Sequence, residues 1–253
     1  MVNNATQRFS SRVDHYMQYR PGYPPEVLTL LKAECGLTRD SIIADVASGT
    51  GIFTRLLLEN GNRVFGVEPN AEMRDAGQRF LAGYSNFTGV AGSAEASTLP
   101  ARSVDIVTAA QAAHWFDRPK ARLEFIRILK AGGWTVLLWN ERKTDGSAFL
   151  RDYEQLLLTY GTDYREVRHE RTTAEIADFF APSKYESRSF AMRQDLDYPS
   201  LEGRLLSSSY TPEPGHPGYA PMLARLRRIF HSHQVNGCVS LEYDTRVFYG
   251  QLA

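Results

Sequence analysis

The sequence contains few cysteines, no long apolar run and no excess of charge of either sign. Its two cysteines, Cys35 and Cys238, lie far apart in a chain of 253 residues, so their spacing gives neither a disulfide framework nor a metal site. No apolar run approaches the ~20 residues that span a bilayer, and the N-terminus lacks the apolar core of a signal peptide. Lysine and arginine together number 29, as do aspartate and glutamate, whereas nucleic-acid enzymes usually need a basic face. We therefore expect a soluble, cytoplasmic protein that acts on small molecules and binds neither membranes nor nucleic acid.

The composition is that of an ordinary globular protein. Hydrophobic residues make up 43% of the chain and charged residues 23%, which suffices for one large domain with a buried core. We interpret the local basic cluster Arg225, Arg227 and Arg228 as a solvated helix face. The oligomeric state stays open between monomer and homodimer.

Strand-like and helix-like segments alternate through the first 140 residues. Such alternation predicts right-handed βαβ units and a doubly wound, mostly parallel α/β sheet with helices on both faces. The predicted strands are 42–46, 64–67, 86–91, 104–109 and 134–139, and the predicted helices are 28–35, 52–60, 71–82 and 120–130.

The regular alternation of strands and helices ends after residue 140. Helices are predicted at 149–160 and 172–180, and two late strands, 187–193 and 245–251, are expected as antiparallel additions at the sheet edge. Between these strands lies a proline-containing insertion, for which we expect two short helices, 200–208 and 220–232. An insertion of this kind cannot belong to the sheet, so we interpret 198–235 as a lid over a ligand cleft.

The turn after the first predicted strand is the most informative part of the chain. Residues 47–51 read Ala-Ser-Gly-Thr-Gly, a turn poor in side chains that can bring backbone N–H groups up to a ligand. Glu68 ends the second predicted strand, 23 positions after Asp45, where an acid can accept hydrogen bonds from both hydroxyls of a ribose. The first half of the chain thus predicts a nucleoside site.

Two features of this turn decide which nucleoside it binds. Thr54 stands where the third glycine of a dinucleotide motif belongs. Asp45, at the tip of the strand, would repel a pyrophosphate, whereas it suits a ligand with an ammonium group and no phosphate. S-adenosylmethionine is such a ligand, with an amino-acid head, a ribose, an adenine and a sulfonium cation.

At this point the sequence resembles the class I S-adenosylmethionine-dependent methyltransferases of the type 11 group, and within them the trans-aconitate methyltransferase-like subset. Five motifs carry the resemblance in order, and a sixth segment, Tyr16 with Arg20-Pro-Gly-Tyr-Pro24, adds to it. They are Asp45–Gly51, Val64–Glu68 with Pro69–Met73, Gly92-Ser-Ala-Glu95 with Leu99-Pro100, Val104–Val107 with Gln111 and His114-Trp-Phe-Asp117, and Arg127-Ile-Leu-Lys-Ala-Gly-Gly133.

The resemblance implies a fold and a division of the chain. It implies a Rossmann-like seven-stranded sheet whose last strand is antiparallel, in a single methyltransferase domain that spans residues 1–253. Residues 1–36 would form an N-terminal cap segment, residues 37–140 the cofactor-binding core, and residues 141–253 the substrate-side half with its helical lid.

The resemblance also implies the ligands and their residues. S-adenosyl-L-methionine would be the cofactor and S-adenosyl-L-homocysteine the product. Glu68 would bind the ribose, Ser93–Glu95 would edge the adenine, and Arg20 would pair with the methionine carboxylate. The complete cofactor set is Tyr16, Arg20, Asp45, Ala47, Ser48, Gly49, Gly51, Glu68, Pro69, Met73, Ser93, Ala94, Glu95 and Gln111.

The acceptor side is less defined by sequence. The set of substrate residues is His114, Trp139, Arg204, Ser208 and Tyr210, and no metal is expected. His114 is the one catalytic candidate, as a general base or by orienting the substrate, although a histidine there can also serve only the backbone. Methyl transfer is an in-line displacement that depends mostly on positioning, and a carboxylate acceptor, the leading candidate, needs no base.

Two departures from the motifs leave alternative functions open. Ala47 replaces the first glycine of the turn, at little cost if its φ angle is negative, and Ser93 replaces an aspartate with a weaker acceptor. A methyltransferase-like protein that binds the cofactor without catalysis is therefore one alternative. A nicotinamide-dependent oxidoreductase is a weaker one, because the third glycine is missing.

Overall fold

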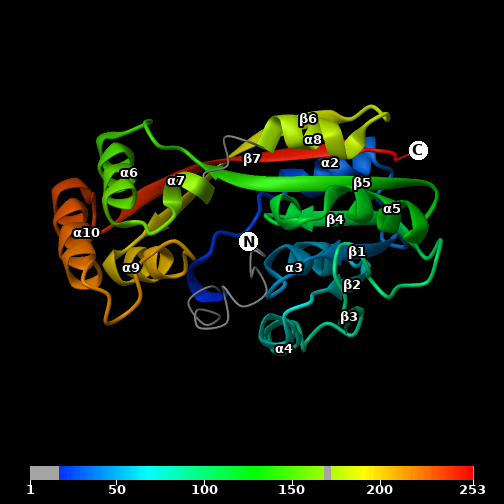
Figure 1. The fold of residues 1–253 in the computed structure, drawn as a ribbon, viewed down its shortest axis with the longest axis horizontal. Coiled ribbons are helices and arrows are strands. Elements are labelled where there is room, and N and C mark those ends of the chain that lie inside the picture. The colour runs from blue at the N-terminus through cyan, green and yellow to red at the C-terminus, as the bar shows by residue number, and fades with distance from the viewer. Residues whose placement is uncertain (1–16, 168–171, 253) are drawn as a thin grey trace.

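A seven-stranded sheet organises the chain (Figure 1). The computed structural model describes residues 17–167 and 172–252, so Tyr16 lies outside the described residues. The strands are β1 (Ile42–Val46), β2 (Arg63–Val67), β3 (Phe87–Val90), β4 (Val104–Ala110), β5 (Leu129–Arg142), β6 (Glu186–Leu196) and β7 (Val239–Gly250). Their spatial order is β3-β2-β1-β4-β5-β7-β6, with β1 to β5 parallel. The predicted doubly wound α/β class is confirmed.

The last strand runs antiparallel to both of its neighbours, as expected from the sequence, but it does not lie at an edge. β7 is inserted between β5 and β6 and pairs with both along most of its length. Its final residues explain this position, because Val247 and Tyr249 pack on one face of the sheet and Phe248 on the other. A strand covered on both faces belongs inside a sheet.

Helices cover the two faces, and their ends follow from local capping. They are α2 (Glu26–Glu34), α3 (Ile52–Glu59), α4 (Ala71–Phe80), α5 (Arg118–Ile128) and α8 (Thr172–Phe180). The helices α2 and α3 pack on one face of the sheet, and α5 and α8 pack on the other. Helix α5 begins two residues before its predicted start, since Asp117 caps it by accepting from the Lys120 N–H. It ends two residues early, at Ile128, because β5 already begins at Leu129.

The remaining helices gather at one end of the molecule. They are α6 (Ala148–Tyr160), α7 (Tyr164–Val167), α9 (Tyr198–Leu206) and α10 (Tyr219–His233). Figure 1 shows them on the left, beyond the part of the sheet that carries β1 to β4. Leu157, Leu201 and Leu226 belong to their apolar core, which β7 reaches with Leu241 and Tyr243. Helices α9 and α10 occupy the insertion between β6 and β7, where the sequence predicted two helices.

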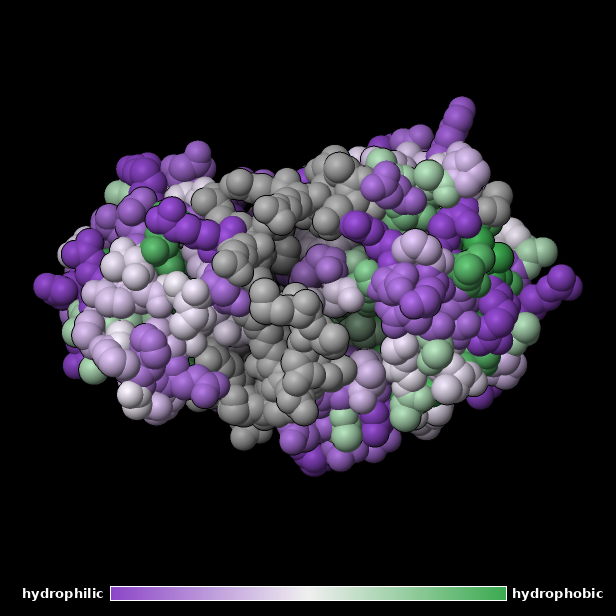
Figure 2. Space-filling view, viewed as in Figure 1, coloured by the Kyte–Doolittle hydropathy of each residue, from purple (hydrophilic) through white to green (hydrophobic). Residues whose placement is uncertain are grey.

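The surface on the face seen in Figure 2 is mostly polar. Among the described residues, apolar side chains there form only small separate patches. No helix in the described part of the chain is long and apolar enough to cross a membrane.

Candidate active site

The turn after β1 has the tight backbone that its sequence predicts. Gly49 and Gly51 have φ angles of 57° and 83°, in the left-handed region, and Gly51 stands directly before α3. Ala47 has a φ angle of 55°, so the condition under which its methyl group would cost little is not met. An alanine in this region costs roughly 1–2 kcal/mol more than a glycine. The turn therefore stores strain at the position where the motif has its first glycine.

Asp45 lies buried directly before this turn. Its carboxylate accepts hydrogen bonds from the hydroxyls of Thr54 on α3, at 2.6 Å, and Thr108 on β4, at 2.8 Å. Burial raises the pKa of Asp45 to about 6, against the two hydrogen bonds that lower it, and the nearby charge of Glu68 adds to the rise. Asp45 thus ties β1, α3 and β4 together and lines the pocket described below.

Glu68 follows β2 and reaches back to the same turn. Its two carboxylate oxygens accept from the backbone N–H groups of Gly49 and Asn70, each at 2.9 Å. Burial raises its pKa, while these two bonds and the Arg74 guanidinium act in the opposite direction. A carboxylate offers about four acceptor positions, so two remain for ligand hydroxyls. Glu68 lies beside the pocket and not among its lining residues.

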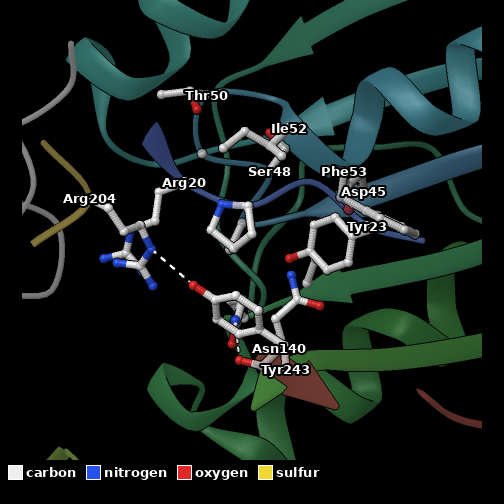
Figure 3. Close-up of a pocket in the computed structure, with 15 residues that line it drawn as sticks. Arg20, Tyr23, Asp45, Ser48, Thr50, Ile52, Phe53, Asn140, Arg204 and Tyr243 are labelled. Atoms are coloured by element: carbon white, nitrogen blue, oxygen red, sulfur yellow. Dashed lines mark hydrogen bonds between the residues drawn. The ribbon is translucent and has the colours of Figure 1, made fainter. Parts of the chain in front are cut away.

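A pocket opens above the turn, between the sheet and the helical end of the molecule (Figure 3). It holds about 540 Å³ of empty space, open solvent at its mouth included. The residues that line it come from the N-terminal segment, the turn after β1, the start of α3, the strands β1, β4, β5 and β7 or the residues that follow them, and α9. They are Arg20, Pro21, Tyr23, Asp45, Ala47, Ser48, Gly49, Thr50, Ile52, Phe53, Ala110, Gln111, Asn140, Arg204 and Tyr243.

Two guanidinium groups reach this pocket, and Figure 3 shows them on the same side, opposite Tyr23 and Phe53. Arg20 donates to the backbone oxygen of Ser207 at 2.9 Å. Arg204 is 6% exposed and donates to the Tyr243 hydroxyl at 3.3 Å and the Ser208 hydroxyl at 3.2 Å. Burial opposes its charge, but the surrounding tyrosines raise its pKa, so it stays protonated. No carboxylate of the described residues pairs with it.

Two buried polar atoms in the pocket have no hydrogen-bond partner among the described residues. The side-chain nitrogen of Gln111 donates to the Asn140 backbone oxygen at 3.1 Å. The side-chain oxygen of Gln111 is buried and receives no hydrogen bond from the described residues. The Thr50 hydroxyl is also buried and unpartnered. An unsatisfied buried group costs roughly 1–3 kcal/mol. A ligand that presents N–H or O–H groups at these two points would remove that cost.

The predicted adenine-edge residues lie on a loop outside the pocket lining. Ser93 and Glu95 are half-buried, and Ala94 is buried. The Glu95 carboxylate accepts from the Asp117 N–H at 2.9 Å, and the Ser93 hydroxyl accepts from the Glu95 N–H at 3.3 Å. The loop is thereby fixed to the start of α5.

Pro69 and Met73, also predicted to bind the cofactor, take different positions. Pro69 is exposed at the start of α4, whereas Met73 is buried. A Cβ atom placed on Gly49 would lie 3.5 Å from the Met73 methyl group, so Met73 packs beneath the turn.

The structure brings His114 and Trp139 together, but in a second, smaller hollow. This hollow holds about 210 Å³ of empty space and is also lined by Leu137, Ile176 and Phe179. Trp139 is 1% exposed and packs edge-to-face on Phe248, at 5.9 Å between ring centres. Neither residue reaches the pocket that holds Arg204, so their predicted roles toward the substrate stay predictions.

The two other predicted substrate residues lie behind Arg204 or away from the pocket. Ser208 is buried and accepts from the Arg204 guanidinium, whereas the Tyr210 ring contacts the Tyr164 ring at 4.8 Å. Sequence reasoning missed Tyr23, Phe53 and Tyr243 as pocket residues. Tyr23 belongs to a motif that carried the resemblance, but Tyr243 has no local signal, because it reaches the pocket through strand pairing.

Comparison with known proteins agrees with this geometry. Residues 44–137 match a family model described as a methyltransferase domain of type 11. An uncharacterized methyltransferase of Mycobacterium tuberculosis is 34% identical over 66% of this chain, and one of Schizosaccharomyces pombe is 32% identical over 53%. The chain spans 64% of the length of the first of these relatives and 53% of the second.

Solved structures share the fold at low sequence identity. A provisionally named type II methyltransferase from Anaeromyxobacter dehalogenans is 20% identical, with a TM-score of 0.68, and the match covers 92% of this chain and 98% of that one. A methyltransferase provisionally assigned to an antibiotic biosynthesis pathway of Anabaena variabilis is 22% identical, with a TM-score of 0.66, and the match covers 93% and 99%. Together with the turn after β1 and the strand order, these matches identify residues 44–137 as a methyltransferase domain of the type 11 family, set in a chain with the fold of known methyltransferases.

Proposed function

We propose that the chain transfers a methyl group from S-adenosylmethionine to a carboxylate oxygen of a small acceptor. The observation that carries the acceptor class is Arg204, a buried guanidinium in the pocket whose partners among the described residues are two neutral hydroxyls. A buried charge normally requires a partner of opposite charge. Three of its five N–H groups remain after these two bonds, and a carboxylate can accept two of them at once.

The residues of the pocket fit the cofactor. The Gln111 oxygen, which has no partner among the described residues, and the Asp45 carboxylate suit its ammonium group, and Arg20 suits its methionine carboxylate. Glu68 would accept from the ribose, and the loop at Ser93 would edge the adenine. The cofactor supplies an electrophilic methyl group on a sulfonium cation. The protein's part is to hold the acceptor oxygen in line with that group, about 3 Å away.

The side chains of the pocket favour an acceptor that needs no deprotonation. Among its described lining residues there is no histidine, lysine, cysteine or glutamate. Asp45 is engaged by two threonines, and the Tyr243 hydroxyl already accepts from Arg204. A carboxylate is ionised at neutral pH, so Arg204 needs only to orient it. In this proposal, the single domain comprises the N-terminal cap, the core 37–140 and a substrate-side half whose lid contributes Arg204.

The test combines cofactor binding with a screen of acceptors. Calorimetry should detect S-adenosylhomocysteine binding, and labelled cofactor should methylate small acids, with trans-aconitate the first to try, in preference to amines and phenols. Arg204→Leu should lower kcat/KM on the acid at least about 100-fold while the Kd for S-adenosylhomocysteine changes little, because removing a charged partner from a buried pair costs several kcal/mol. Arg204→Lys should recover only part of the activity.

Arg225→Leu, at an exposed position of α10, is the matched control and should behave as wild type. Methylation of amines or phenols alone, or full activity in Arg204→Leu, would contradict the carboxylate acceptor.

A cofactor-binding protein without catalysis is the second candidate, and the strain at Ala47 favours it, since the turn there departs from the motif. Binding of S-adenosylhomocysteine with no methyl transfer to any compound in the screen would support it. Absence of binding at millimolar concentration would refute both candidates.

A further inference from the structure

A row of hydrogen bonds joins the N-terminal segment to Arg204. The Gln194 side chain on β6 donates to the Tyr19 backbone oxygen at 3.0 Å. The Tyr243 hydroxyl on β7 donates to the Gln194 side-chain oxygen over a long 3.4 Å, and Arg204 on α9 donates to the Tyr243 hydroxyl at 3.3 Å. The row therefore runs from residues 19–23, which carry Arg20 into the pocket, to the guanidinium proposed to bind the acceptor.

The chemistry of the groups fixes the direction of each of these bonds. Guanidinium and amide N–H groups only donate, and the Tyr19 carbonyl only accepts. Tyr243 therefore accepts from Arg204, and its own O–H donates to the Gln194 side-chain oxygen. Both functions of its hydroxyl are in use, so Tyr243 positions Arg204 and cannot act as a base.

Packing joins the same two parts a second time. The Tyr19 ring lies against the backbone of α9 at Gly203, where an added Cβ atom would come within 2.2 Å of the ring. Arg20 donates to the Ser207 carbonyl at the end of the same helix. Any movement of the segment 19–23 relative to the end of α9 would therefore break these contacts.

We infer that Gln194 and Tyr243 are positioning residues that set the Arg204 guanidinium relative to the segment 19–23, so that a cofactor held by this segment also orders the acceptor site. This inference rests on the proposed function. It adds that the cofactor site and the acceptor site are coupled through hydrogen bonds of Gln194 on β6 and Tyr243 on β7. Of these two residues, Tyr243 lines the pocket and Gln194 does not. Linkage makes any such coupling reciprocal.

Hydrogen exchange with S-adenosylhomocysteine as the probe tests the coupling without a known acceptor. In the wild type, saturating ligand should slow exchange in residues 19–23 and also in residues 204–208, the latter at least about fivefold, the low end of couplings between linked sites. In Gln194→Leu and Tyr243→Phe, the ligand should still protect residues 19–23, but its effect on 204–208 should be clearly weaker than in the wild type, and what remains should come through the contacts of Tyr19 and Arg20 with α9.

The matched control is Ser240→Ala, which removes another side-chain bond between β6 and β7, from Ser240 to Asp195, at an exposed site. It should keep the wild-type response, and unchanged exchange along β5 would show that each variant is folded. Equal protection of 204–208 in the wild type and both variants would overturn the inference, as would no protection there in the wild type. Failure of the wild type to bind the probe at all would instead refute the proposed function, and this inference with it.

Discussion

Asp45 makes the stability of the protein depend on pH in a way that a single substitution should remove. Its pKa is raised from 3.8 to about 6 by burial, so the folded state holds this proton more tightly than the unfolded state. Between these two values the folded state binds more protons, and the free energy of unfolding falls as pH rises. Above pH 6 the carboxylate is ionised in both states, and its effect on stability becomes constant.

The size of this effect follows from the shift. Two units of pKa, at 1.36 kcal/mol each, give about 3 kcal/mol of stability that is present below pH 4 and absent above pH 6. This is a large part of the ~5–15 kcal/mol that stabilises a typical domain. In Asp45→Asn the amide oxygen still accepts from one threonine, and the other threonine hydroxyl can turn to accept from the amide nitrogen.

Urea unfolding of both proteins from pH 4 to pH 8 measures the effect. Subtracting the wild-type free energy of unfolding from that of the variant at each pH removes the contributions of titrating groups that the substitution leaves unchanged. The stability of Asp45→Asn relative to wild type should increase by about 3 kcal/mol across this range. Its affinity for S-adenosylhomocysteine should fall at pH 7.5, because the charge proposed to face the ammonium group is lost. A difference that does not vary with pH would refute the reasoning.

Two further substitutions test the turn and its neighbour. Ala47→Gly should relieve the left-handed strain and raise the free energy of unfolding by about 1 kcal/mol, or roughly 2–4 °C in Tm, by thermal unfolding; a loss of stability would show that the turn is not strained. Glu68→Ala should weaken S-adenosylhomocysteine binding at least tenfold, about 1.4 kcal/mol, by calorimetry, and should destabilise the fold because the Gly49 and Asn70 amides lose their acceptor. Unchanged affinity in that variant would place the ribose elsewhere.

The sequence predicted the parts of the site that short segments determine. The turn 47–51 and the acid at Glu68 lie at the ends of neighbouring parallel strands, and the ends of such strands always meet at one edge of the sheet. Their proximity therefore followed from spacing alone. The left-handed backbone of Ala47 did not, since no local pattern distinguishes it from an alanine with negative φ.

The acceptor side depends on geometry that sequence patterns do not contain. Trp139 and Asn140 are neighbours on β5, and their side chains point to opposite faces, so Asn140 lines the pocket and Trp139 the second hollow. Gln111 takes a φ angle of 57° directly after β4 and lines the pocket, whereas His114, three residues further on, lines the second hollow. Tyr243 meets Arg204 only because β7 pairs with β6 in one particular register.

The position of β7 between β5 and β6 also determines when this part of the sheet can form during synthesis. β5 and β6 are made first but do not pair with each other, because the strand that lies between them follows both in the chain. Until β7 leaves the ribosome, both present an unpaired edge that other chains can bind. Its pairing with β5 joins residues about 100 positions apart, such as Asn140 and Thr245, and such contacts form slowly. A shortened C-terminus would therefore remove the centre of this half of the sheet, not its margin.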